Sequence, residues 1–93
     1  MKRNNGIKII QTARFLRSAQ RLPKSIMKKS QIREAIFRKD PFDQRLRTHK
    51  LHGALDDFYA YSVDYHYRII FRFLDSQTVA YHEIGTHDVY GAQ

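Results

Sequence analysis

The chain has 93 residues, of which 42% are hydrophobic and 13% aromatic, and these proportions predict one folded domain over residues 1–93. It contains no cysteine, which excludes disulfides and thiolate catalysis, and no apolar run reaches the roughly 20 residues of a membrane helix, so we expect a cytoplasmic protein without a membrane partner. The net charge of +8 favours a polyanionic partner such as nucleic acid.

The first part of the chain predicts a strand followed by two helices. Residues 6–11 are apolar and β-branched, as is typical of a strand, and Thr12 is suited to cap the N-terminus of a helix. An amphipathic pattern follows Thr12 and predicts a helix that Pro23 closes. An apolar stripe along residues 24–39 predicts a second helix, which Asp40-Pro41 ends because the residue before proline avoids the helical region. The two helices are expected to form a hairpin.

The second part of the chain predicts an antiparallel sheet. Residues 45–51 are interpreted as an edge strand or extended segment. Residues 58–63, 67–74 and 78–84 are rich in aromatic and β-branched side chains, and short polar turns separate them, as in a meander. The predicted fold class is therefore α+β, with the first strand and the helical hairpin packed on one face of a mainly antiparallel sheet of four or five strands.

Alternation along residues 67–73 predicts two different faces of one strand. Tyr67, Ile69 and Phe71 fall on one face, whereas Arg68 and Arg72 fall on the other. Because a fully buried guanidinium is costly, the arginine face must be at least partly hydrated or ion-paired. We therefore expect the helical hairpin on the apolar face and the functional site on the face of Arg68.

The charges and the histidines are separated along the sequence. Residues 1–50 hold 15 Lys and Arg against 3 Asp and Glu, whereas residues 51–93 hold 2 against 6. All five histidines lie at position 49 or later. Folding must therefore bring the basic surface and the candidate acid/base groups together.

Three motifs in this order of elements resemble the RelE/ParE superfamily of bacterial toxins. They are Leu51-His52-Gly53, the strand Tyr67-Arg68-Ile69-Ile70-Phe71, and the closing segment Ile84-Gly85-Thr86-His87-Asp88-Val89-Tyr90. The resemblance covers nearly the whole chain, and within the superfamily the histidines resemble the YafQ type more than RelE itself. It implies a RelE-like fold and the toxin of a type II toxin–antitoxin system. The YafQ-type resemblance further implies an mRNA interferase, that is, a metal-independent endoribonuclease that acts on the ribosome, inhibits translation and is neutralised by a cognate antitoxin.

The same resemblance implies the residues of the site. Arg68 matches a strand arginine that stabilises charge at the scissile phosphate, and His87 and His49 match catalytic histidines of the YafQ type. His66 occupies a turn where that type has an aspartate, and Tyr90 lies near a C-terminal aromatic that stacks on a base or aids proton transfer. The residues expected to bind RNA are Arg47, Lys50, Arg72, Lys28 and Lys29.

Metal-free cleavage of RNA explains why such residue types are needed. The reaction requires a base for the 2′-hydroxyl, a cation for the phosphorane and an acid for the 5′-oxygen. Histidine titrates closest to neutral pH, so His87 and His49, with His66 as a substitute, are the expected acid and base. No metal and no small-molecule cofactor is expected.

Two departures from the family pattern leave the general base open. Tyr59 and Tyr61 stand where RelE has a lysine pair, and Ser62 stands where the YafQ type has a histidine.

Other readings of the same residues remain open. A ParE-like toxin of this fold would bind and inhibit DNA gyrase without nuclease activity, and a plain nucleic-acid-binding module would use only the basic helices. Arg68 can also be read as the structural partner of Asp64 or Glu83. The remaining histidines, His52 and His82, are expected to be structural or solvent-facing.

Overall fold

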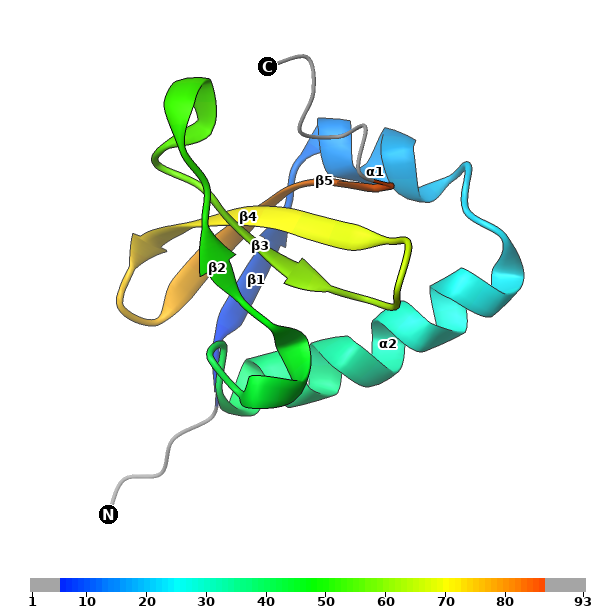
Figure 1. The fold of residues 1–93 in the computed structure, drawn as a ribbon, viewed down its shortest axis with the longest axis horizontal. Helices are drawn as coiled ribbons and strands as arrows, with labels where there is room; N and C mark the ends of the chain where they lie inside the picture. The colour runs from blue at the N-terminus through cyan, green and yellow to red at the C-terminus, as the bar shows by residue number, and fades with distance from the viewer. Residues whose placement is uncertain (1–5, 87–93) are drawn as a thin grey trace.

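Residues 6–86, which the computed structural model describes, form a five-stranded sheet with two α-helices packed on it (Figure 1). The elements follow in the order β1 (Lys8–Gln11), α1 (Ala13–Ala19), α2 (Lys24–Lys39), β2 (His49–Lys50), β3 (Tyr59–Ser62), β4 (Arg68–Asp75) and β5 (Thr78–Gly85). Two short 3-10 helices, η1 (Gln44–Leu46) and η2 (Gly53–Leu55), flank β2. The predicted α+β class and the strand–helix–helix–sheet order are confirmed.

The strands are arranged in the order β1-β5-β4-β3-β2. β2, β3, β4 and β5 pair with their neighbours in antiparallel fashion, whereas β1 pairs with β5 in parallel (Figure 1). A parallel pair needs a long crossover connection, and the chain between β1 and β5 supplies it. The sheet is therefore mainly antiparallel, as expected, with its N-terminal strand as the parallel member.

The main core lies between the helices and one face of the sheet. Phe37 of α2 is fully buried, and its ring centroid lies 4.8 Å from that of Tyr61, 4.9 Å from Phe71 and 6.0 Å from Tyr81. One helical side chain thus joins α2 to the three central strands. Ile69 and Phe71 of β4 both belong to this core, so the apolar face predicted for the strand is confirmed.

The opposite face of the sheet carries a smaller buried cluster. Leu51, Ala60 and Ile70 form it, with Phe58 partly buried against them. Ile70 is therefore separated from its neighbours Ile69 and Phe71, as alternation requires. Arg68 lies two residues before Ile70 and shares this second face.

The helix boundaries agree closely with the sequence signals. Thr12 caps α1 as predicted, because its hydroxyl oxygen accepts a hydrogen bond from the Phe15 backbone N–H at 3.1 Å. α1 ends at Ala19, and α2 begins directly after Pro23. No helix within residues 6–86 combines the length and the apolar character needed to cross a bilayer.

The expected edge strand over residues 45–51 is shorter than predicted. Only His49 and Lys50 pair with β3, and η1 precedes them. Leu46 is fully buried, and Asp43 caps η1 by accepting a hydrogen bond from the Arg45 backbone N–H at 2.9 Å. Burial of Leu46 therefore favours a tight turn over an extended chain here.

Candidate functional site

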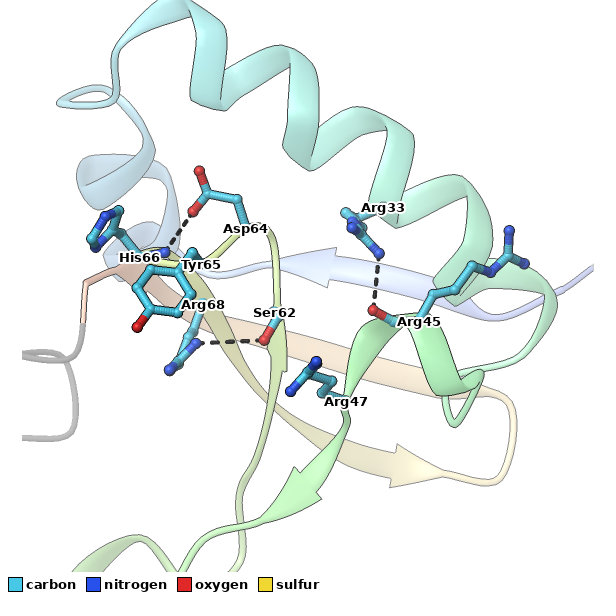
Figure 2. Close-up of a pocket in the computed structure, with 8 residues that line it drawn as sticks. All are labelled: Arg33, Arg45, Arg47, Ser62, Asp64, Tyr65, His66 and Arg68. Atoms are coloured by element: carbon cyan, nitrogen blue, oxygen red, sulfur yellow. Dashed lines mark hydrogen bonds between the residues drawn. The ribbon is translucent and has the colours of Figure 1, made fainter.

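A cleft of about 510 Å³ opens where β3 ends and β4 begins, with α2 along one side (Figure 2). Residues from α2, from the turn before β2, from β3, from the β3–β4 turn and from β4 line it: Arg33, Arg45, Arg47, Ser62, Asp64, Tyr65, His66 and Arg68. The lining contains four arginines and one carboxylate, so the cleft is electropositive and suits an anionic ligand.

Arg68 is held at the first position of β4. It pairs in register with Ser62 of β3 and with Gly85 of β5, and its guanidinium NH1 donates to the Ser62 hydroxyl oxygen at 3.4 Å (Figure 2). Both acids considered as its ion-pair partners contact other cations. The Asp64 carboxylate lies 3.4 Å from the Lys29 ammonium, and the Glu83 carboxylate lies 3.0 Å from the Arg14 guanidinium.

The β3–β4 turn is organised by the carboxylate of Asp64. Its Oδ1 accepts hydrogen bonds from the backbone N–H groups of His66 and Tyr67, each at 2.9 Å. Burial raises the pKa of this carboxyl, but the hydrogen bonds from Tyr67, His66 and Lys29 outweigh it, so the pKa is lowered. Asp64 therefore stays ionised near neutral pH and holds the turn that presents its neighbours to the cleft.

Tyr65 and His66 are presented side by side from that turn. The Tyr65 ring is 86% exposed, and its centroid lies 5.0 Å from that of His66 in an edge-to-face arrangement. Tyr65 carries no predicted role, although an aromatic residue inside a polar turn is a sequence signal for a surface contact. Both rings line the cleft that contains Arg68 (Figure 2).

The structure places the predicted catalytic residues differently. Arg68 and His66 line the cleft. His49 pairs with Ala60 and so faces the same side of the sheet, but it is not among the cleft-lining residues, and its Nδ1 lies 3.0 Å from the Arg47 carbonyl oxygen. His87 and Tyr90 lie outside the described residues.

The residues expected to bind RNA are dispersed around this cleft. Arg47 lines it, and Lys29 contacts Asp64 at its edge. Arg72 shares the sheet face of the cleft, whereas the register of Lys50 directs it to the helix side. Lys28 is exposed on α2. Arg47 is therefore the member of this set that belongs to the cleft itself.

Tyr59 and Tyr61, the positions where the resemblance implies a lysine pair, are not among the residues that line the cleft. Tyr61 is fully buried in the main core, with its hydroxyl 2.7 Å from that of Tyr81, and burial raises its pKa. Tyr59 is partly buried against the same core and stacks on Phe71. Ser62 is the β3 side chain that lines the cleft. Neither tyrosine therefore takes over the position of a lysine beside Arg68.

Two further cleft-lining arginines, Arg33 and Arg45, were not predicted from the sequence. Arg33 follows Lys29 by one helical turn, a spacing that puts both side chains on the same face of α2. That spacing predicts that the two side chains share a face of the helix, but it does not predict which strand this face packs against. Within residues 6–86, no group of three or more His, Cys, Asp and Glu side chains gathers where it could hold a metal ion.

The sheet order and the two helices packed on the sheet give this chain the fold of RelE/ParE-like toxins. Escherichia coli YafQ shares it with a TM-score of 0.75 and 16% identity, over 92% of this chain and 99% of YafQ. The YoeB/ParE toxin of Agrobacterium tumefaciens has a TM-score of 0.72 and 16% identity, over 87% of this chain and 99% of the toxin. A chain of the toxin–antitoxin complex RelBE2 of Mycobacterium tuberculosis has a TM-score of 0.70 and 19% identity, over 88% of this chain and 99% of that chain.

These TM-scores establish a common fold, whereas the low sequence identities leave the activity to be argued from the site. No family model matches the chain, and no curated protein matches it.

Proposed function

We propose that this protein is the toxin of a type II toxin–antitoxin pair and cleaves messenger RNA on the ribosome without a metal. One observation carries the proposal: Arg68 and the imidazole of His66 line a single electropositive cleft, on a fold that YafQ and RelE toxins share. The proposal treats residues 1–93 as one toxin domain that acts in the cytoplasm.

The proposed reaction is an intramolecular transesterification. The 2′-hydroxyl loses its proton to a base and attacks the adjacent phosphorus, the bond to the 5′-oxygen breaks, and an acid protonates that oxygen. The products are a 2′,3′-cyclic phosphate and a free 5′-hydroxyl. Arg68 supplies a preorganised positive charge to the nonbridging oxygens, because its planar guanidinium projects from a strand that is hydrogen-bonded on both sides.

Three histidines remain candidates for proton transfer. His66 is the strongest on geometry, because it lines the cleft with Arg68. His49 shares the sheet face, and its role would require its ring to turn toward the cleft. His87 lies outside the described residues, and it is proposed as the second proton-transfer group from its match to a catalytic histidine of the YafQ type.

The remaining site residues would bind the substrate around the reacting phosphate. Arg47, Lys28, Lys29, Lys50 and Arg72 are proposed to contact flanking RNA phosphates. The exposed ring of Tyr65 offers a surface on which a base can stack, which is worth about 1–3 kcal/mol, and Tyr90 is proposed for the same role or for proton transfer.

Substitution of Arg68 tests the nuclease directly. Arg68→Ala is expected to reduce cleavage of RNA by about 10²-fold or more and to relieve growth arrest when the gene is induced, because it removes the charge that stabilises the phosphorane. His66→Ala should also slow cleavage, whereas His52→Ala, a matched change at an exposed histidine that does not line the cleft, should not. Mapping transcript 5′ ends after induction measures the effect in cells.

The same experiment separates the alternatives. Intact transcripts together with blocked DNA supercoiling would replace the nuclease by a ParE-like inhibitor of gyrase. Full toxicity of Arg68→Ala, combined with loss of nucleic-acid affinity on neutralising Arg14 and Arg17, would favour a binding module without chemistry.

A cognate antitoxin is the proposed protein partner. YafQ has been solved with DinJ, and an archaeal RelE with RelB. The basic cleft favours a partner with an acidic or amphipathic segment that covers it. Coexpression of a small protein encoded beside this gene should relieve growth arrest and yield a complex that copurifies.

A further inference from the structure

The backbone at Arg47 has an unusual conformation for a residue with a side chain. Its φ is 54° and its ψ is 39°, and it is the one non-glycine residue of positive φ within residues 6–86. This left-handed conformation brings Cβ close to the following carbonyl oxygen, a clash that glycine avoids. Strain of this kind persists only where the surroundings enforce it, and it is concentrated at ligand-binding positions.

Hydrogen bonds and the burial of Leu46 fix the turn that carries Arg47. The Asp43 carboxylate accepts hydrogen bonds from Nε and NH2 of Arg45, each at 2.9 Å, in addition to the backbone N–H of the same residue. Arg33 NH1 donates to the Arg45 carbonyl oxygen at 2.9 Å, which ties the turn to α2. Leu46, between Arg45 and Arg47, is fully buried. The conformation of Arg47 is therefore imposed by packing and by hydrogen bonds from two sides.

This turn determines the directions of the Arg45 and Arg47 side chains. In Figure 2 the Arg47 guanidinium points toward Ser62, while the Arg45 side chain points away from the cleft and toward its ion pair with Asp43. Arg33 descends from α2 onto the same wall, and its bond to Arg45 uses one of the five N–H donors of a guanidinium. Arg33 and Arg47 thus present two cations from the side of the cleft opposite to Arg68.

Ser62 lies between the two sides of the cleft. It pairs in register with Arg68 and accepts a hydrogen bond from NH1 of Arg68 at 3.4 Å, and in Figure 2 the Arg47 guanidinium points toward it from the other side. Arg47 itself lies in the turn before β2, which begins at His49. The cleft therefore has cations on both sides of Ser62.

We propose that Arg33 and Arg47 form a second phosphate-binding subsite, which takes the phosphate next to the scissile one on single-stranded RNA. The inference rests on the proposed function and deepens it, since Arg68 then serves the scissile phosphate alone. The bound phosphate offsets the repulsion between guanidinium groups that three different elements bring to one cleft. The strained turn is explained as the device that aims Arg47 at this phosphate.

Arg47→Gly is the decisive variant, because glycine adopts the left-handed conformation without strain. We expect its Tm to equal or exceed that of the wild type. Its affinity for a single-stranded 2′-O-methyl oligoribonucleotide, which lacks the attacking hydroxyl, should fall roughly 10-fold. The slope of log Kd against log salt should decrease by about 0.7. Fluorescence anisotropy measures both, and Lys24→Gln, a loss of one charge at an exposed position outside the cleft, is the matched control.

A double-mutant cycle, with one change in the protein and one in the RNA, identifies the phosphate that Arg47 contacts. One phosphate of the oligonucleotide at a time is replaced by an uncharged methylphosphonate, and the scissile position in its sequence is taken from the transcript 5′ ends mapped after induction. The wild type should lose affinity when the phosphate next to the scissile one is neutralised. Arg47→Gly should show no further loss of affinity from that modification, but it should still lose affinity when the scissile phosphate is neutralised. Arg33→Gln should show the same pattern. Wild-type affinity of Arg47→Gly, or coupling of Arg47 to the same phosphate as Arg68, would overturn the subsite.

Failure of the subsite and failure of the nuclease give different results. If the wild type cleaves RNA in an Arg68-dependent manner but Arg47→Gly shows no coupling, the subsite is wrong and the nuclease stands. If the wild type does not bind the oligonucleotide and transcripts also stay intact after induction, both proposals are wrong.

Discussion

His82 shows at the scale of one residue how burial sets a proton affinity. The imidazole is half-buried on β5, with its ring centroid 4.8 Å from that of Phe58. Burial lowers its pKa from the usual 6.5, the cations of Arg14 and Arg72 lower it further, and Glu83 opposes them. The histidine is therefore neutral in the fold at a pH where it would be protonated in the unfolded chain.

This shift predicts a loss of stability in mild acid. Because the folded pKa is depressed, the unfolded state binds the proton first, so stability is retained above the unfolded pKa and declines as the pH falls below it toward the folded pKa. Urea denaturation between about pH 7.5 and about pH 5 should show a smaller decline for His82→Gln than for the wild type. If the stability of His82→Gln declines as much as that of the wild type, other groups cause the decline. His52→Gln, a substitution at an exposed histidine, is the control.

The resemblance ranks His49 ahead of His66 as a proton-transfer residue, and this ranking stays a prediction. In the structure His66 lines the cleft with Arg68, whereas His49 is not among the lining residues. Sequence position could not decide this, because the direction of each ring depends on the Asp64 turn and on the turn before β2.

At the scale of elements, Thr12 joins the start of α1 to β5. Its hydroxyl oxygen accepts from the Phe15 backbone N–H, and the hydroxyl donates to the Tyr81 carbonyl oxygen at 2.8 Å. A cap is thus also a contact between a helix and the central part of the sheet. Its presence was predictable from the sequence, whereas its link to a strand far along the chain was not.

Removal of this hydroxyl should destabilise the fold by more than an ordinary cap. Thr12→Ala is expected to lower the free energy of unfolding by about 1–2 kcal/mol, because it removes the hydroxyl bonds to the Phe15 N–H and to the Tyr81 carbonyl oxygen, which keeps only the bond from the backbone N–H of residue 12 at 3.3 Å. Thr12→Ser retains the hydroxyl and should recover most of the loss. Denaturation midpoints of the three proteins measure it, and equal stability of the alanine and serine variants would contradict the role of the hydroxyl.

The segment before β2 shows where element prediction fails. An extended strand was expected over residues 45–51, but burial of Leu46 and the Asp43 cap produce η1 and the left-handed turn at Arg47. Nothing in local alternation distinguishes these outcomes, since the deciding contacts come from α2 and from the core. For the same reason the sequence did not predict that Arg33 joins Arg47 in the proposed second phosphate subsite.

At the scale of the whole molecule, stability depends on a core that one helix completes. Phe37→Ala should lower the free energy of unfolding by about 3–5 kcal/mol, because it leaves a cavity between α2 and the rings of Tyr61, Phe71 and Tyr81. Phe42, whose side chain is 54% exposed, is the matched control, and Phe42→Ala should cost less than about half as much. Comparable losses in urea denaturation would mean that the core is not centred on Phe37.

The charge asymmetry of the chain also acquires a meaning only in the whole molecule. The basic first half contributes Arg33, Arg45 and Arg47 to the cleft, and the second half contributes Arg68 and His66. The helical hairpin and the sheet bring these two halves together along the end of β3. The cleft is thus formed by segments that lie far apart in the sequence.

The sequence by itself determined the two helices, the strands β1, β3, β4 and β5, the α+β class, and the apolar and arginine faces of β4, and it made Arg68 a candidate. Capping, proline placement and alternation are properties of neighbouring residues, so they can be read locally. Only the tertiary structure decided which side chains meet Arg68: it admitted Arg33, Tyr65 and His66 to the cleft and directed Tyr61 into the core. Periodicity reports the face on which a side chain lies, whereas the partner across that face is chosen by how distant elements pack.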